Sequence, residues 1–225
     1  MPLSWVGIAN ASLMRLGVAE LITSFASTNK VTILCNANWE SARDAVLESW
    51  DWKCASARAQ LTQLTATPIY GPLFAYPLPT TPYCLKVREM SPRVANYQIE
   101  GRNLLTDVDS TVDDIFIRYT ARVTDPTQLD NLVARAISLR LAVDIGYALV
   151  REKGLVERID AEYYEALEEA QSKNQAGGKD HNSEPGWWQN GSLYDQAGRY
   201  VGIDDERLID NADNWVNAGQ WIMNT

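Results

Sequence analysis

The chain has 225 residues, of which 46% are hydrophobic and 22% are charged, a composition that supports one ample core or two small ones. The net charge of −9 argues against a protein that grips nucleic acid through its phosphates, because such proteins carry a basic face. The opening MPLSWVGIANASLMRLGV lacks the pattern of a signal peptide, and no stretch is apolar for long enough to span a bilayer. We therefore expect assembly in the cytosol, without a membrane.

Residues 1–54 are predicted to form two helices. Ser4 is a good N-cap for the first helix, and Gly17 ends it. The second helix begins near Val31. The apolar positions recur at helical spacing in both segments. They are Trp5, Ile8, Ala9, Leu13 and Leu16 in the first helix and Trp39, Ala42, Val46 and Trp50 in the second.

Residues 55–123 have a different character and are predicted to form an inserted β-rich domain. Five prolines exclude long helices from its first half: Pro68, Pro72, Pro77, Pro79 and Pro82. Residues 83–90 and 114–123 alternate between apolar and polar side chains, which is typical of strands with one buried face. Shorter strands are expected around Leu61 and at 74–76, 97–99 and 104–105. The segment therefore predicts a small antiparallel sheet.

Residues 124–175 return to a helical pattern with a clear start signal. Asp125 is suited to the N-cap, Pro126 to the first helical position and Gln128 to a capping box. The apolar stripe that follows is wide, so this helix is expected to be the most buried element. The stripe comprises Leu129, Leu132, Val133, Ala136, Ile137, Leu139, Leu141, Ala142, Val143, Ile145, Ala148 and Leu149.

A second helix is expected directly afterwards, which makes the pair a helical hairpin. Arg140 and Asp144 are spaced to pair within the first helix, and Gly154 is expected to end it. The inward residues of the second helix are predicted to be Val156, Ile159, Tyr163, Leu167 and Ala170. Its glutamates are expected to face mostly outward: Glu157, Glu162, Glu165, Glu168 and Glu169.

Residues 176–225 begin as a Gly- and Asn-rich linker and continue as an aromatic segment. Disordered segments usually lack aromatic residues, so we expect this arm to lie on a partner surface. Its candidate docking residues are Trp187, Trp188, Tyr194, Tyr200, Trp215 and Trp221. The predicted fold is therefore α+β: an antiparallel helical bundle from 1–54 and 124–175, an inserted β-sheet domain at 55–123 and an extended C-terminal arm.

The order of these regions resembles the head-to-tail adaptors of short-tailed phages, the podovirus tail tubular protein A or gatekeeper family. Three segments carry the resemblance: NANWESARDAVLESWDWKCASARAQLTQL, FAYPLPTTPYCLKVREM and IFIRYTARVTDPTQLDNLVARAISLRLAVDIGYALV. The last is similar to the family pattern of a strand ending in Arg-Tyr, an Asp-Pro step and a long Ala- and Leu-rich helix. The likeness covers residues 3–173, and the Trp-rich tail departs from it.

The resemblance implies a structural virion protein at the head–tail junction and no enzymatic activity. It implies a homo-oligomeric, dodecameric ring that docks on the portal protein and offers a platform for the tail nozzle protein. DNA would pass through the lumen without specific binding, and the acidic hairpin is a candidate for lining that lumen. Each subunit of such a ring uses two different surfaces to contact its neighbours.

The residue types that could act in catalysis or bind a metal form no pattern that indicates a catalytic, cofactor or metal site. His181 is the sole histidine and lies in the linker without an evident partner, so we interpret it as a solvated residue. Two acidic clusters lack the pattern of a calcium-binding loop and are interpreted as solvated turns. They are Asp107, Asp109, Asp113 and Asp114, and Asp204, Asp205 and Glu206. Cys35, Cys54 and Cys84 have no zinc-site or disulfide spacing, and buried thiols are expected.

Other functions remain open at this stage. A head-completion connector of a long-tailed phage also docks on a portal but is mainly helical, and the predicted strands count against it. A DNA-binding regulator that uses the helical hairpin is disfavoured by the acidic charge. An enzyme is the least supported alternative.

Overall fold

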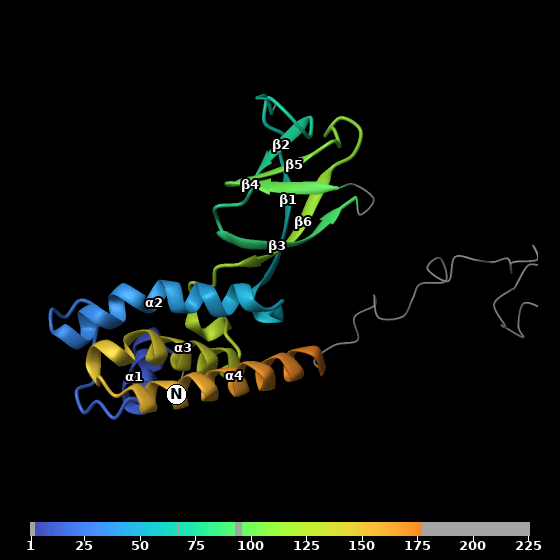
Figure 1. The fold of residues 1–225 in the computed structure, drawn as a ribbon. Helices are drawn as coiled ribbons and strands as arrows, with labels where there is room; N and C mark the ends of the chain where they lie inside the picture. Colours follow the sequence, from blue (N-terminus) through green and yellow to red (C-terminus); the bar gives the residue numbers. More distant parts are fainter. Residues whose placement is uncertain (1–2, 67, 93–95, 177–225) are drawn as a thin grey trace, which may run out of the picture. The chain divides into compact units, whose positions relative to one another are not determined.

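The computed structural model describes residues 3–66, 68–92 and 96–176, which lie in one compact unit, Met1–Gly177. These residues form four α-helices and two antiparallel three-stranded sheets (Figure 1). All six strands lie between the second and third helices in the chain. The mixed α+β class predicted from the sequence is confirmed.

The first two helices begin at side-chain caps. Helix α1 spans Trp5–Arg15, and the Ser4 hydroxyl accepts a hydrogen bond from the Gly7 amide at 3.0 Å, as predicted. Gly17 follows the helix with a φ of +70°, a conformation that glycine adopts without strain. Helix α2 spans Lys30–Ser49 and is capped by Asn29, which accepts from the Thr32 amide at 2.8 Å.

The start of the third helix differs from the prediction. Asp125 caps a short 3₁₀ turn at Pro126–Gln128, and helix α3 begins later, spanning Asn131–Leu149 after Asp130. Leu129 separates the two, with an extended backbone and a side chain that is only 4% exposed. Burying this leucine in the helical core interrupts the helix that Asp125 was expected to start.

The expected role of Gly154 is also wrong. Helix α3 ends at Leu149, and Arg151 adopts the left-handed conformation at the turn, with a φ of 57°. Helix α4 spans Lys153–Ala176, so Gly154 lies in its first turn instead of ending α3.

Helix α3 is the centre of the helical part of the molecule, which we define as residues 3–54 and 124–176. Helices α1, α2 and α4 all contact it. Its contact with α4 depends on Gly146, because a Cβ there would come within 2.7 Å of the Val156 side chain. Helix α3 was expected to be the most buried element, and it has more buried residues than any other helix or strand of the described part. Its buried residues are Val133, Ala134, Ala136, Ile137, Ser138, Leu139, Leu141, Ala142, Ile145 and Gly146.

The strands form two sheets where the sequence predicted one. The first has the order β1-β6-β3, with β1 at Ser56–Leu61, β6 at Ile115–Ala121 and β3 at Cys84–Ser91. The second has the order β2-β5-β4, with β2 at Phe74–Pro77, β5 at Asn103–Thr106 and β4 at Tyr97–Glu100. The alternating segments predicted at 83–90 and 114–123 are thus confirmed as strands, paired with each other through β3 and β6.

The β part, residues 55–123, has an apolar core of its own. Tyr76 and Leu104 from one sheet join Ile115, Ile117 and Tyr119 from the other, and all five are at most 2% exposed. This core is distinct from the larger cluster that the helices bury. The described residues therefore contain two hydrophobic cores. The parts that enclose them are connected by polar contacts and by Ala55, Leu85 and Val123, which pack against the helical core.

Candidate functional site

The connection between the two parts starts where α2 ends. Residues 50–55 link α2 to β1, and Trp52 in this link is 1% exposed. Its indole N–H donates to the Val46 carbonyl at 2.8 Å, which folds the link back onto the helix. A tryptophan suits this position because its ring fills apolar space while its one donor is satisfied.

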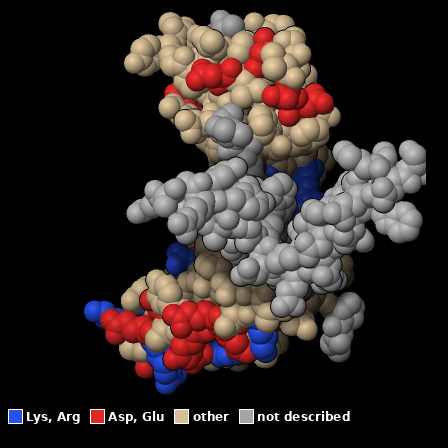
Figure 2. Space-filling model, turned by 90° about the vertical axis from the view of Figure 1, so that its right-hand side faces the viewer, with Lys and Arg blue, Asp and Glu red and all other residues tan. Residues whose placement is uncertain are grey.

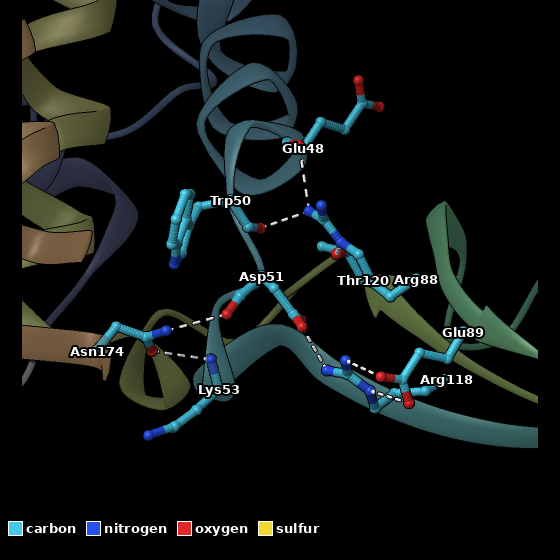
Figure 3. Close-up of polar contacts among 9 residues, drawn as sticks. All are labelled: Glu48, Trp50, Asp51, Lys53, Arg88, Glu89, Arg118, Thr120 and Asn174. Atoms are coloured by element: carbon cyan, nitrogen blue, oxygen red, sulfur yellow. Dashed lines mark hydrogen bonds and ion pairs between the residues drawn. The ribbon is translucent and has the colours of Figure 1, made fainter. Parts of the chain in front are cut away.

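Arg88 on β3 caps the carboxyl end of α2. Its guanidinium donates to the carbonyls of Glu48 at 3.1 Å and Trp50 at 2.5 Å, and to the Thr120 hydroxyl at 2.8 Å (Figure 3). The last carbonyls of a helix lack partners within the helix and carry partial negative charge. Helix α2 has no basic residue in its own last turn, so a strand of the β part supplies the cation. Burial lowers the pKa of Arg88, and Asp51 opposes that shift.

Arg118 on β6 forms a second contact between the two parts. Its guanidinium binds both carboxylate oxygens of Glu89, at 3.1 and 3.2 Å, and the Asp51 carboxylate at 2.5 Å (Figure 3). Glu89 lies opposite Arg118 in the β3–β6 register, whereas Asp51 belongs to the link after α2. The hydrogen bonds to Glu89 are the largest cause of a raised pKa for Arg118, and Asp51 acts in the same direction. This arginine ties the first sheet to the helical part.

Asn174 fixes the end of α4 to the same link. Its side chain accepts a hydrogen bond from the Lys53 amide at 3.1 Å and donates one to the Asp51 carbonyl at 3.0 Å (Figure 3). The amide group thus binds both a donor and an acceptor of the link backbone. Helix α4 ends two residues later, at Ala176. The described structure therefore ends close to this link.

A further polar cluster lies along α2. Asp44 accepts from Arg43 at 2.9 Å and from Arg122 at 2.5 Å, and Arg122 also covers the Tyr83 ring at 4.5 Å. Arg102 lies over the same ring at 4.0 Å. We call this cluster and the contacts of Figure 3 together the joint. Most contacts of the joint are charge-assisted hydrogen bonds between the β part and α2 or the link after it.

The far end of the β part presents apolar side chains to solvent. Ile69 and Tyr70 are fully or almost fully exposed, at 105% and 94%, and Leu73 is 61% exposed. Val112 in the neighbouring loop is 77% exposed. We call the described loop residues 62–66, 68–73 and 107–114 together the tip. Contiguous exposed apolar groups of this kind mark interaction surfaces.

The two loops of the tip are bonded to each other. The Leu73 amide donates to the Asp107 carboxylate at 3.1 Å, and Gln63 accepts from the Ser110 amide at 2.9 Å. Asp109 accepts from the Thr111 amide at 2.9 Å within its own loop. Asp107 is exposed and Asp109 is partly exposed, as expected for solvated turn residues, and Asp107 also links the two loops.

Sequence reasoning missed the tip, although a signal for it exists. No Asp, Glu, Lys or Arg occurs between Arg58 and Lys86. A stretch of this length without charge is unusual for loops in water, and only part of it enters the β core.

The acidic face of α4 follows the prediction. Glu157, Glu165, Glu168 and Glu169 are exposed and Glu162 is half-buried. In Figure 2, acidic and basic groups gather together over the helices in the lower half, whereas the upper half, which holds the strands, shows separate acidic patches on an otherwise uncharged surface. Glu157, Glu162 and Glu169 form ion pairs, whereas Glu165 and Glu168 form none within the described residues.

Several candidate residues lie outside the described residues: Trp187, Trp188, Tyr194, Tyr200, Trp215, Trp221, His181, Asp204, Asp205 and Glu206. In the described part of the chain, no group of three or more His, Cys, Asp or Glu side chains is arranged to hold a metal ion. No helix in the described ranges is long and apolar enough to cross a membrane.

The three cysteines follow the prediction only in part. Cys35 and Cys84 are buried, but Cys54 in the link is partly exposed. Burial raises the pKa of all three thiols above the ordinary value.

Comparison with known proteins gives no relative: no family model matches the chain, and no curated protein matches it.

Proposed function

We propose that the protein is a structural head-to-tail adaptor of a short-tailed phage. In this role it docks as a ring under the portal protein, extends the DNA channel and forms the platform for the tail nozzle protein. The task is structural and needs no catalytic group or cofactor. The protein assembles in the host cytoplasm and becomes part of the virion at the head–tail junction.

The observation that carries the proposal is the order of elements. Two helices precede the six strands and two follow them, which is the order on which the family resemblance rests. In this proposal the helical part is an antiparallel bundle and the β part is a domain inserted into it. The joint supports the proposal as well, because an adaptor has to hold two separate binding ends in a fixed relation.

The charge distribution fits a channel that DNA passes without binding. The helical part has ten Lys and Arg residues against fifteen Asp and Glu residues. An acidic α4 face in the lumen repels phosphates, so DNA slides past it without being held. The C-terminal arm then adds contact area on the portal or on a neighbouring subunit through its tryptophans and tyrosines.

The strands disfavour a head-completion connector of a long-tailed phage, which is mainly helical. Strands β3 and β6, at Cys84–Ser91 and Ile115–Ala121, are the longest of the six and pair with each other. A DNA-binding regulator would need a basic face, whereas the helical hairpin is acidic.

The proposal is tested by mixing the purified protein with the portal ring of its phage and imaging the product by electron microscopy. We expect an added layer with the symmetry of the portal. A folded protein that leaves a competent portal ring bare would remove the proposal. Duplex DNA binding that weakens steeply with salt would instead favour the regulator.

A further inference from the structure

A shallow groove lies between α1 and α3 on the surface of the helical part. Its volume is about 430 Å³. Small residues at helical spacing form part of its lining on both helices, which leaves a depression between the two backbones. They include Gly7 and Ala11 on α1 and Ala134 and Ser138 on α3, with the buried Ile8 beside them.

Two arginines also line the groove. Arg15 and Arg135 have side chains that are 40% and 44% exposed, and they pair with Glu162 at 2.6 Å and Glu169 at 3.3 Å. Ion pairs this exposed contribute little to stability. A guanidinium has five N–H donors, so each arginine retains donors for a second acidic partner.

The tip has the complementary properties. Ile69 and Tyr70 project from a loop that has no charged residue, and Asp113 and Asp114 are exposed in the adjacent loop. Hydrogen bonds join the two loops at Leu73–Asp107 and Gln63–Ser110, which restricts their movement relative to each other and lowers the entropic cost of binding. The tip therefore offers exposed apolar side chains on one loop and two carboxylates on the loop bonded to it, and the groove offers apolar space beside two guanidinium groups.

We propose that the tip of one copy binds the α1–α3 groove of a second copy. Ile69 and Tyr70 enter the groove, and Asp113 and Asp114 face Arg15 and Arg135. The two surfaces differ, so the contact is heterologous, and repeated contacts of this kind close into a ring when the rotation between copies allows it. The inference deepens the proposed function because it names the surfaces that join neighbouring subunits in the ring.

The test is a disulfide cross-link between two variants of the full chain. Tyr70→Cys protein is mixed with Ala11→Cys protein under mild oxidation, and the cross-linked residues are mapped by mass spectrometry. We expect a dimer linked from position 70 to position 11 in the mixture. The matched control replaces Tyr70→Cys by Tyr164→Cys, because Tyr164 is an exposed tyrosine on α4. A yield no higher than that of the control pair would overturn the inference.

Sedimentation of single variants gives a second measurement. Ile69→Asp should raise the dissociation constant between copies about tenfold or more, because it places a charge at the centre of the contact. Ile33→Asp is the control, since Ile33 is also exposed, at 56%, but lies on α2. Equal effects of the two substitutions would overturn the inference.

The two proposals fail separately. A portal-bound layer without the cross-link from position 70 to position 11 would overturn this subunit contact and leave the adaptor function standing. The cross-link without any layer on the portal would support the contact and remove the adaptor function.

Discussion

The helical part and the β part differ in their net charge and in the apolar side chains that they expose to solvent. The helical part has ten basic and fifteen acidic residues among 105, whereas residues 55–123 have seven basic and six acidic residues among 69, so the two parts differ mainly in the sign of their net charge. Most of the large hydrophobic side chains exposed in the described ranges belong to the β part: Leu64, Ile69, Tyr70, Leu73, Ile99, Val112 and Phe116. We infer a division of work, in which the acidic face of α4 stays in solvent and the tip of the β part makes contacts.

The two parts also differ in how they are stabilised. The helical core is large and centred on α3, but the β core is small and shared by two short sheets. A small core supplies little net stability on its own. We therefore expect the β part to depend on the joint more than the helical part does.

The largest expected effect comes from placing a charge in either core. Ile137 in α3 and Ile117 in β6 are 0% and 2% exposed, so Ile137→Asp and Ile117→Asp should each cost several kcal/mol or more and prevent folding. Circular dichroism and thermal melting measure the outcome. Phe116→Asp is the matched control, because Phe116 is the next residue on the strand but is 45% exposed. A fully folded Ile117→Asp protein would show that the assigned β core is wrong.

The joint is tested by Arg118→Met. This change removes the guanidinium that binds both Asp51 and Glu89, and we expect a loss of about 1–2 kcal/mol after solvent screening. Chemical denaturation measures the loss. Arg58→Met is the control, because Arg58 lies opposite Arg118 on β1 and makes no ion pair within the described residues. Equal losses in the two variants would mean that the joint adds no stability.

A smaller effect is expected from Asn174→Ala. The change removes two hydrogen bonds to the link and should cost about 1 kcal/mol. Hydrogen exchange should show faster opening of the last turn of α4, with unchanged exchange in α3. Unchanged exchange at the end of α4 would argue that packing alone holds this helix in place.

The smallest effect on folding is expected from deleting residues 180–225. The truncated chain keeps every described element, so its melting temperature should stay close to that of the full chain. Ring assembly on the portal should weaken, because the aromatic arm is lost. An unfolded truncation would show that the arm belongs to the core.

Local signals in the sequence predicted much of the fold. The cap at Ser4, the strands β3 and β6 and the Arg140–Asp144 ion pair follow from residues close together in the chain. The errors concern the two ends of α3. Leu129 is buried in the helical core, and α3 begins after it; the left-handed turn at Arg151 ends the helix before Gly154.

The joint and the tip could not be predicted in the same way. Arg88 reaches carbonyls about forty residues earlier in the chain, and a single sequence does not show which arginine will cap which helix. The expectation of one sheet failed because the division into β1-β6-β3 and β2-β5-β4 depends on pairing between distant strands.

The central claim is that the tip makes contacts in the assembly while the acidic face of α4 stays in solvent. Its most direct test compares two tyrosines. Tyr70 at the tip and Tyr164 on α4 are 94% and 55% exposed in the single chain. Hydroxyl-radical footprinting of the protein before and after assembly on the portal ring compares their oxidation. We expect Tyr70 to become protected while Tyr164 stays reactive. Protection of Tyr164 with an unchanged Tyr70 would contradict the division.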